Sequence, residues 1–238
     1  MSQVHSATRT EHPLGPAPAA RPSALILDFG GVISRTLFET HASTEQALGL
    51  APGTLQWRGP FAPQTDPLWQ SMQAGTISER DYWATRSREV GQLLGEQWEQ
   101  METFVQRARG AEPSAVIRPE AVATINAVKA AGMKLAVLSN ELDLFYGTGF
   151  RGKLPLLSQF DLIIDATHTG ILKPDPRAYL ACTQALELAP AQCVFVDDQP
   201  RNVAGADALG LLTVQFDVRD PKRSYSQALE LLGLKGLN

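Results

Sequence analysis

Residues 24–33 read ALILDFGGVI, and this stretch decides the fold. Its first four residues are apolar and predict a buried strand over Ala24–Leu27, which places Asp28 at the carboxyl end of the strand, shortly before two glycines. Open α/β sheets bind their ligands in the crevice outside the carboxyl ends of the strands. We therefore expect the Asp28 carboxylate to face such a crevice, although a strand-end Asp by itself often only caps a turn.

Short apolar runs alternate with helical stretches over much of the remaining chain. Continuous apolar runs are typical of parallel strands that are covered on both faces. The further expected strands are Lys134–Leu138, Leu162–Ile164, Val194–Val196 and Leu212–Gln215, and the expected helices are Pro119–Ala131, Pro176–Leu188, Pro200–Leu209 and Tyr225–Leu232. This alternation predicts an α/β fold in which a parallel sheet lies between two layers of helices, a three-layer α/β/α sandwich.

Residues 38–111 break the alternation, because they contain no convincing strand. Helices are expected at Glu39–Leu48, Pro67–Ala74, Ser78–Val90 and Gly95–Arg109, and Ser78 with Asp81 resembles a capping box. An insertion directly after the first strand would lie above the Asp28 crevice and act as a lid, or else be a decoration without a catalytic part. We expect a core of residues 23–37 and 112–238, a helical cap of residues 38–111 and a disordered tail of residues 1–22.

The composition argues against several classes of protein. Of 238 residues 44% are hydrophobic and 19% are charged, and the net charge of -4 gives no attraction to nucleic acid or to an anionic membrane. No apolar stretch approaches the ~20 residues of a membrane span, and the first 22 residues lack the apolar middle region of a secretory signal. The two cysteines and four histidines have no metal-type spacing, so we expect reduced, buried thiols and a cytoplasmic protein without a zinc site. The oligomeric state leaves no mark on the sequence.

Asp28 is a candidate nucleophile, because carboxylates form covalent intermediates that include aspartyl phosphates. Attack on a phosphate dianion needs charge neutralisation, which Asp197 and Asp198, directly after the strand Val194–Val196, would supply by holding a cation. Mg²⁺ suits such a set, since it takes oxygen ligands and substrate phosphate, and it would orient the phosphoryl oxygens for in-line attack. Helix capping is the plainer alternative for two adjacent aspartates after a strand.

Ser139, Asn140 and Lys173 are candidate ligands of the phosphate. The Ser139 hydroxyl and the Asn140 backbone N–H follow a strand and would bind a phosphoryl oxygen, while the Lys173 ammonium is a point charge suited to phosphate. Asn202 would support Lys173 or the metal ligands through hydrogen bonds. Ordinary alternatives are a turn for Ser139-Asn140, a solvated loop for Lys173 and the first turn of a helix for Asn202.

Residues 147–152, GTGFRG, match the dinucleotide-binding pattern G-x-G-x-x-G. That fingerprint must follow a strand immediately and open a helix, but Glu141–Tyr146 intervenes here. We therefore expect a flexible loop and no dinucleotide site.

Four motifs occur in order along the chain: DFGGVI at 28–33, LSN at 138–140, KPDP at 173–176 and FVDDQPRN at 195–202. Together they resemble the four motifs of the haloacid dehalogenase superfamily, over about residues 23–218. The resemblance implies a Rossmann-like core, a helical cap inserted after the first motif, and Mg²⁺-dependent hydrolysis of phosphomonoesters through an aspartyl phosphate. The roles that it implies are Asp28 and Lys173 as catalytic residues, Ser139, Asn140 and Lys173 as phosphate ligands, and Asp28, the Gly30 carbonyl, Asp197 and Asp198 as metal ligands.

Gly30 departs from the usual phosphatase pattern, which has a second Asp two residues after the nucleophile as general acid/base. Losing a positioned acid/base typically removes ~10²–10⁴ in rate. A leaving group that needs little protonation, such as that of a sugar anomeric phosphate or an acyl phosphate, would be affected least. Some similar phosphatases, including sugar-1-phosphate phosphatases, carry the same glycine.

Two functions other than phosphatase activity on a small phosphorylated metabolite stay open. A 2-haloacid dehalogenase would use Asp28 to attack carbon without a metal, but Asp197 and Asp198 would then repel the anionic substrate. A catalytically impaired phosphate-binding or regulatory protein is the other, and Gly30 motivates it. The substrate is expected to be selected by side chains over the crevice, for which the candidates are Arg35, Trp57, Arg58, Trp69 and Tyr82.

Overall fold

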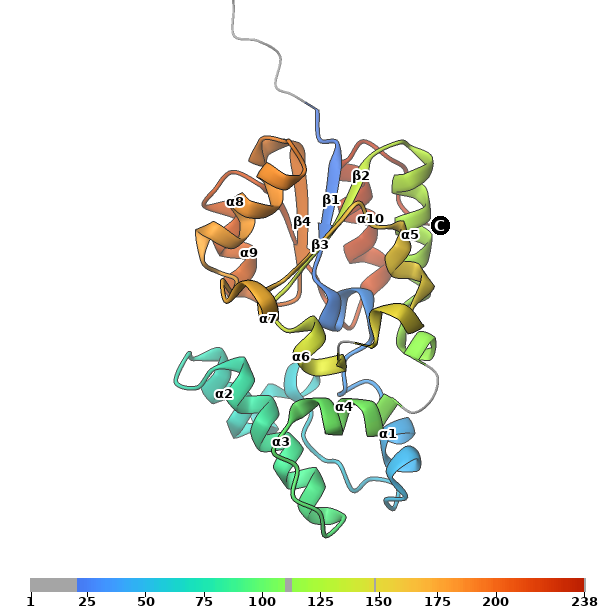
Figure 1. Ribbon diagram of the computed structural model, residues 1–238, viewed down its shortest axis with the longest axis vertical. Helices are drawn as coiled ribbons and strands as arrows, with labels where there is room; N and C mark the ends of the chain where they lie inside the picture. Colours follow the sequence, from blue (N-terminus) through green and yellow to red (C-terminus); the bar gives the residue numbers. More distant parts are fainter. Residues whose placement is uncertain (1–20, 110–112, 148, 238) are drawn as a thin grey trace, which may run out of the picture.

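The computed structural model describes residues 21–109, 113–147 and 149–237, so that residues 1–20 of the expected tail lie outside the described residues. Five parallel strands form one sheet in the order β3-β2-β1-β4-β5. The strands are β1 (Ala24–Leu27), β2 (Lys134–Ser139), β3 (Leu162–Asp165), β4 (Cys193–Asp197) and β5 (Leu212–Gln215). The α/β prediction and all five expected strands are confirmed (Figure 1).

Helices cover both faces of the sheet. One face packs against α5 (Pro119–Ala130) and α10 (Pro221–Leu231), and the other against α8 (Pro176–Ala185) and α9 (Pro200–Asp207) (Figure 1). Alternate residues of β1 serve the two layers: Leu25 and Leu27 belong to the cluster of α5 and α10, while Ala24 and Ile26 belong to the cluster of α8 and α9. Burial on both faces explains why β1 and the interior of β2 and β4 are apolar.

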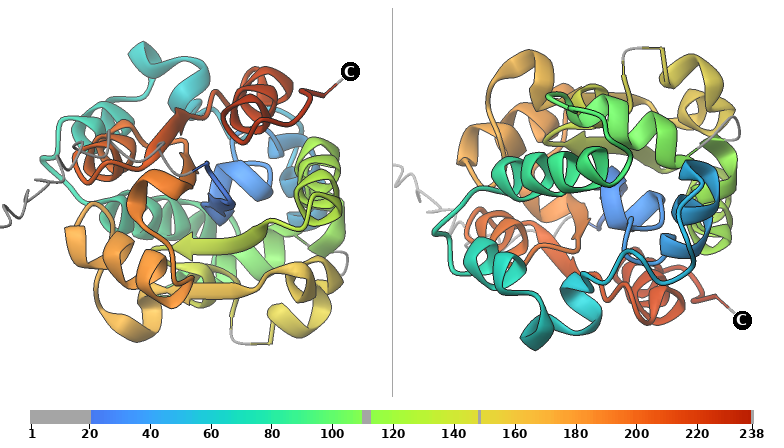
Figure 2. Two further views of the ribbon diagram at one scale, coloured as in Figure 1. Left: turned by 90° about the horizontal axis from the view of Figure 1, so that it is seen from above. Right: turned by 90° about the horizontal axis from the view of Figure 1, so that it is seen from below.

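Four further helices form a helical cap beyond the carboxyl ends of the strands (Figure 1; Figure 2, right). They are α1 (His41–Leu48), α2 (Pro67–Gln73), α3 (Glu79–Leu93) and α4 (Met101–Arg109). The cap has an apolar cluster of its own, centred on Phe38, Trp57, Trp69, Tyr82 and Trp83. The domain boundaries proposed at residues 38 and 111 stay a prediction, since residues 110–112 lie outside the described residues.

Gly59 lets the Phe38 ring of this cluster pack directly against the backbone. Its φ is +47°, and a Cβ at this position would overlap the Phe38 ring. Only glycine accommodates both the backbone conformation and the contact. Phe38 in turn has ring contacts with Trp57 and Trp69 at centroid distances of 5.3 Å.

Several helix boundaries differ from the prediction. The capping box at Ser78 is present, but α4 begins at Met101 instead of Gly95, because Gly95 takes a left-handed φ of +70° and ends α3. Helix α10 begins at Pro221, since the side chain of Asp220 accepts from the backbone N of Arg223. Short elements that the sequence did not reveal are α6 (Leu142–Tyr146), α7 (Ala166–Thr169), the helical turn Phe29–Ile33, and 3-10 turns at Gly59–Phe61, Pro63–Thr65, Pro113–Val116, Arg151–Lys153, Pro155–Gln159 and Pro190–Gln192.

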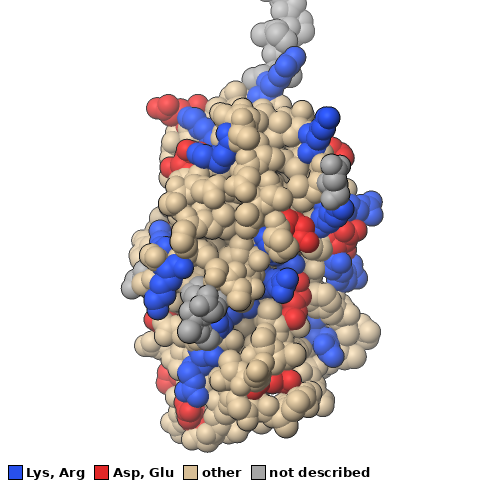
Figure 3. Space-filling model, turned by 90° about the vertical axis from the view of Figure 1, so that its right-hand side faces the viewer, with Lys and Arg blue, Asp and Glu red and all other residues tan. Residues whose placement is uncertain are grey.

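The distribution of surface charge and the state of the two cysteines agree with what the composition predicts. Basic and acidic side chains are interspersed over the face drawn in Figure 3. Cys182 and Cys193 are buried and unpaired, as predicted. Among the described residues, none of the helices combines the length and the apolar character needed to span a bilayer.

Candidate active site

The carboxyl ends of neighbouring strands bring four predicted site residues together. Asp28 follows β1, Ser139 ends β2, and Asp197 ends β4 with Asp198 beside it. Because β1 pairs in parallel with both β2 and β4, these ends lie at one edge of the sheet. Carboxylate oxygens of Asp28, Asp197 and Asp198 all lie within 4.8 Å of one another.

Lys173 lies between two of these carboxylates. Its Nζ donates to Oδ1 of Asp28 at 2.8 Å and to Oδ2 of Asp197 at 2.6 Å, and its side chain is only 1% exposed. Burial alone would lower the pKa of Lys173, but the charges of Asp197 and Asp28 outweigh burial and raise that pKa. Asn140 fixes the loop, because its Oδ1 accepts from the backbone N of Lys173 at 2.7 Å and its Nδ2 donates to the carbonyl of Lys173 at 3.1 Å. Lys173 is therefore a fixed cation beside Asp28.

Asp197 is completely buried, and both its carboxylate oxygens already accept hydrogen bonds. Oδ1 accepts from the backbone N of Gln199 at 2.8 Å and from Nδ2 of Asn202 at 3.1 Å. Oδ2 accepts from Nζ of Lys173 and from the same Nδ2 at 3.1 Å. These donors occupy the oxygens that a metal ion would need, so the geometry favours a role for Asp197 in positioning Lys173. Asn202 reaches Lys173 only through Asp197.

Asp198 differs from its neighbour, because within the described residues its carboxylate accepts no hydrogen bond from the protein. Burial raises the pKa of Asp198 well above its ordinary value, and the charges of Asp197, Asp28 and Glu79 raise it further. Gly31 makes room for this carboxylate: its φ is +79°, and a Cβ there would lie 2.7 Å from Oδ2 of Asp198. The fold thus holds a carboxylate in place without neutralising it.

Asp28 and Asp198 together offer the ligands that a divalent cation needs. Burial raises the pKa of Asp28 to about 7; Lys173 opposes this rise, and the charge of Asp197 adds to it. A bound cation would offset the excess negative charge, and Mg²⁺ prefers carboxylate oxygens in such a site. The residues present therefore fit Mg²⁺, with Asp28 and Asp198 as the better placed ligands and Gly30 lining the same cavity.

A cavity of about 850 Å³, counted to its open mouth, lies between the strand ends and the cap. We call its strand-end residues the floor, which consists of Asp28, Ser139, Asn140, Lys173 and Asp198. We call its cap residues the roof, which consists of Phe38, Pro60, Trp69, Glu79, Trp83 and Val105. The Ser139 hydroxyl accepts from the backbone N of Glu141 at 3.4 Å, and this contact leaves its own proton available to a ligand.

The roof differs in part from the cap contacts expected from the sequence. Trp69 and Arg35 line the cavity, whereas Trp57, Arg58 and Tyr82 are not among its lining residues. Tyr82 is fully buried inside the cap, where its hydroxyl donates to Oδ2 of Asp66 at 3.0 Å. The sequence could not separate these residues, because the orientation of each helix depends on the packing of the whole cap.

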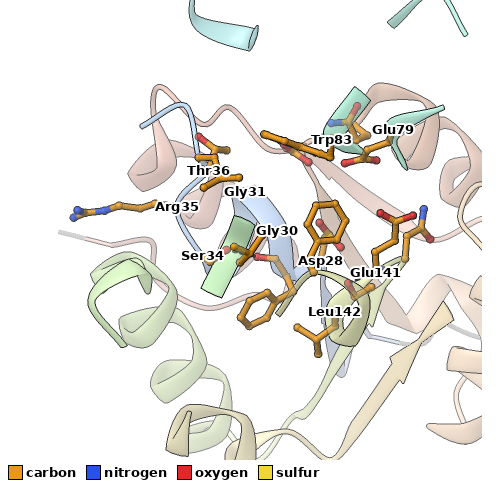
Figure 4. A pocket seen from close by; sticks show the side chains of 18 of the residues that line it. Asp28, Gly30, Gly31, Ser34, Arg35, Thr36, Glu79, Trp83, Glu141 and Leu142 are labelled. Atoms are coloured by element: carbon orange, nitrogen blue, oxygen red, sulfur yellow. Dashed lines mark hydrogen bonds between the residues drawn. The ribbon is translucent and has the colours of Figure 1, made fainter. Parts of the chain in front are cut away.

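Two carboxyl groups that sequence reasoning missed, Glu79 and Glu141, also line the cavity. Glu79 begins α3, and Figure 4 shows it with Trp83 on the opposite side of the cavity from Asp28. Its Oε2 pairs with Nη2 of Arg201 at 3.1 Å. Glu141 follows the Ser139-Asn140 motif, and its Oε1 pairs with Nε of Arg80 at 2.9 Å. The only sequence signal for either was the position next to a motif or a helix start.

A second acidic cluster, outside the cavity, joins Asp143, Asp165 and His168. Arg151 donates to Asp143 at 2.9 Å and to Asp165 at 3.0 Å, and His168 lies 2.6 Å from Asp143. Because a cation of the chain already lies between the two carboxylates, this cluster is an ion-pair network that ties α6 to α7.

Comparison with known proteins gives a family match over most of the chain. The family described as haloacid dehalogenase-like hydrolase matches residues 9–210. Acyl-CoA dehydrogenase family member 10 of Mus musculus is 36% identical over 116 residues, which are 48% of this chain and 10% of that protein. (S)-2-haloacid dehalogenase 1 of Pseudomonas sp. strain CBS-3 is 33% identical over 121 residues, 50% of this chain and 52% of that one.

A phosphatase and a solved structure complete the comparison. Phosphatase MT3486 of Mycobacterium tuberculosis is 31% identical over 99 residues, 42% of this chain and 46% of that one. The chain thus spans about half the length, or less, of these three relatives. The crystal structure of YfnB from Bacillus subtilis, bound to magnesium, superposes with a TM-score of 0.63 at 16% identity, covering 90% of this chain and 100% of that one. At this identity the structural likeness carries the fold alone.

Proposed function

The chain belongs to the haloacid dehalogenase-like hydrolase family, and on this premise we propose that it is a Mg²⁺-dependent phosphatase of a small phosphorylated metabolite. The observation that carries the proposal is the contrast between the two adjacent aspartates beside Asp28. Asp197 is hydrogen-bonded to Lys173, whereas Asp198 has no partner of its own among the described residues. An unneutralised carboxylate beside a candidate nucleophile supports a bound cation and an anionic substrate.

In the proposed reaction an oxygen of Asp28 attacks phosphorus, and the bond from phosphorus to the leaving oxygen breaks. Lys173 and the Ser139 hydroxyl bind phosphoryl oxygens, and Lys173 also fixes the Asp28 carboxylate through its 2.8 Å hydrogen bond. Asp28, Asp198 and the Gly30 carbonyl would hold Mg²⁺, which supplies charge neutralisation and orients the phosphate. Water then hydrolyses the aspartyl phosphate and releases inorganic phosphate.

Two further residues keep this arrangement rigid. Asp197 holds Lys173 from the side away from the substrate, and Asn202 holds Asp197. The aromatic roof lowers the polarity of one side of the cavity, which strengthens the electrostatic interactions at the floor.

A 2-haloacid dehalogenase is the second candidate, and the 33% identity to (S)-2-haloacid dehalogenase 1 favours it. In that case Asp28 would displace a halide from carbon. Asp198 is evidence against it, because the ionised form of this carboxylate would repel the carboxylate of a haloacid.

The experiment that separates these functions measures the release of phosphate and of chloride. Wild-type protein is assayed on sugar phosphates, nucleotides and acyl phosphates with Mg²⁺ or with EDTA, and on 2-chloropropionate under both conditions. We expect phosphate release that requires Mg²⁺ and falls on the order of 10⁴-fold or more in Asp28→Asn. Asp207→Asn, at an exposed position of α9, is the matched control and should retain full activity.

Other outcomes of this assay contradict the proposal. Chloride release in EDTA, lost in Asp28→Asn, would assign the protein to the dehalogenases. No release from any substrate at high enzyme concentration would favour a non-catalytic phosphate-binding or regulatory protein.

A further inference from the structure

The proposed phosphatase reaction needs a proton donor for its leaving group, and the floor of the cavity does not supply one. An alkoxide is a poor leaving group unless an acid protonates its oxygen as the bond to phosphorus breaks. Gly30 has no side chain, Asp28 is the nucleophile, and Asp198 is a cation ligand in the proposed function. Lys173 is held by Asp28 and Asp197, whose charges stabilise its protonated form.

The other titratable side chains that line the cavity within the described residues are Arg35, Arg109, Tyr146, Glu79 and Glu141. Arginine does not give up its proton in a protein. The Tyr146 hydroxyl lies 3.0 Å from the hydroxyl of Ser34 and is engaged there. The two glutamates are left as candidate donors.

Glu79 is the better placed of the two, because it comes from the roof. A phosphoryl group attacked by Asp28 has its leaving oxygen on the side away from Asp28, and that side faces the cap. Glu79 and Asp28 lie on opposite sides of the cavity (Figure 4). The charge of Glu79 is close enough to act on both Asp28 and Asp198.

The surroundings of Glu79 suit a carboxyl group that gains and loses a proton near neutral pH. Burial raises the pKa of Glu79 to about 7, the charges of Glu141 and Asp197 add to the rise, and Arg201 and Lys173 oppose it. Glu141 is only 7% exposed, and its Oε2 has no hydrogen-bond partner among the described residues. When Glu141 is ionised, its negative charge makes ionisation of the neighbouring Glu79 unfavourable.

We propose that Glu79 of the cap is the general acid and base of the phosphatase, in the role that Gly30 cannot fill; this inference rests on the proposed function. In the first half-reaction the protonated Glu79 gives its proton to the leaving oxygen as Asp28 bonds to phosphorus, and a neutral alcohol departs. In the second half-reaction the Glu79 carboxylate takes a proton from the water that attacks phosphorus, the bond to Asp28 breaks, and phosphate leaves. Each turnover returns Glu79 to its protonated form.

This assignment widens the substrate class, because a chain with a proton donor is not restricted to leaving groups of low basicity. Phosphate monoesters of ordinary alcohols become substrates, in addition to acyl phosphates. The effect of removing Glu79 must then depend on the leaving group.

The test compares two kinds of substrate in Glu79→Gln. The probes are glycerol 3-phosphate and glucose 6-phosphate, which release alcohols, and acetyl phosphate, whose carboxylate leaves without a proton. We expect kcat/KM on the alcohol esters to fall about 10²–10⁴-fold, while kcat/KM on acetyl phosphate, which reports only the first half-reaction, stays nearly unchanged. Glu89→Gln, on the same helix but not lining this cavity, should change neither rate.

Rescue at Gly30 makes the test independent of folding defects. Gly30 has φ -71° and ψ 124°, which any residue adopts, and nothing lies within 4 Å of a Cβ at this position. Gly30→Asp in the Glu79→Gln background should therefore fold and recover part of the activity on alcohol esters.

Three outcomes overturn the proposal. Equal losses on both kinds of substrate in Glu79→Gln would assign Glu79 a structural role. Wild-type activity on acetyl phosphate but on neither alcohol ester would exclude a working proton donor. A wild-type protein that hydrolyses no phosphate compound would remove the proposed function itself, and the inference with it.

Discussion

The buried Asp66 carboxylate of the cap and the half-buried Asp198 carboxylate of the floor have opposite surroundings. In the cap, Asp66 accepts from the backbone N of Gly59 at 3.2 Å and of Trp69 at 3.0 Å, from the Tyr82 hydroxyl at 3.0 Å and from Nη2 of Arg86 at 2.6 Å. At the floor, Asp198 accepts no such bond within the described part of the chain. A carboxylate that stabilises a fold is neutralised by the chain itself, whereas one that binds a cation is left for the cation.

This contrast also separates Asp197 from Asp198, although they are neighbours in sequence. Asp197 resembles Asp66, since donors surround both of its oxygens. A pair of adjacent aspartates after a strand thus contains one residue that positions Lys173 and one that is left unneutralised. The predictions below test this difference, beginning with the largest expected effect.

Asp66→Ala should destabilise the protein most, because Nη2 of Arg86 and three other donors lose their acceptor. We expect the free energy of unfolding to fall by about 3–5 kcal/mol. Denaturant unfolding at pH 7 measures it, with Asp207→Ala as an exposed control. A loss below about 1 kcal/mol would mean that these hydrogen bonds do not neutralise the carboxylate.

His41 makes the stability of the cap depend on pH. Its ring is buried against Trp57 at a centroid distance of 4.3 Å, neither nitrogen has a partner among the described residues, and burial lowers its pKa from 6.5 to about 4. The unfolded chain therefore binds the proton first, so that the contribution is complete above pH 6.5 and is lost as the pH falls toward 4. As the pH falls through this window, the unfolding free energy of wild type should fall by about 3 kcal/mol relative to that of His41→Phe. A difference that does not vary with pH would place the proton on the folded ring.

Asp198→Asn should affect stability only when Mg²⁺ is present. Without the ion the variant should unfold at the same or a higher denaturant concentration, because Asn removes a carboxylate whose ionised form is unfavourable at this site. With Mg²⁺ at a hundredfold excess over Kd, wild type should gain about 2.7 kcal/mol and the variant clearly less. If Asp198→Asn lowered stability without Mg²⁺, as Asp66→Ala is expected to, the contrast between the two carboxylates would be wrong.

The smallest effect is expected for a carboxylate that is exposed. Lys129 and Asp161 pair at 3.2 Å with side chains that are 39% and 41% exposed. Lys129→Gln should change the unfolding free energy by less than about 1 kcal/mol, and the change should vanish in high salt. A larger and salt-independent loss would show that burial is not what separates the carboxylates of this protein.

The floor was more predictable than the roof. Asp28, Ser139 and Asp198 each end or follow an apolar strand, and parallel pairing places such ends together whatever the helices do. Glu79 and Trp83 begin an ordinary amphipathic helix, and nothing in their sequence says that this part of the helix faces the cavity. Tyr82 lies between them in the chain and faces the inside of the cap.

The sequence by itself determined the α/β sheet and the chemistry at its carboxyl edge, because apolar strands with polar ends alternate with helices, and this alternation specifies a parallel sheet. Only the tertiary structure decided which aspartate is neutralised by Lys173 and which cap residues form the roof. Those outcomes depend on hydrogen bonds and ring contacts between segments far apart in the chain, such as Asp197 with Lys173 and Phe38 with Gly59. Asp197 and Asp198 are identical neighbours in the sequence, and their carboxylates acquire opposite surroundings only when the chain folds.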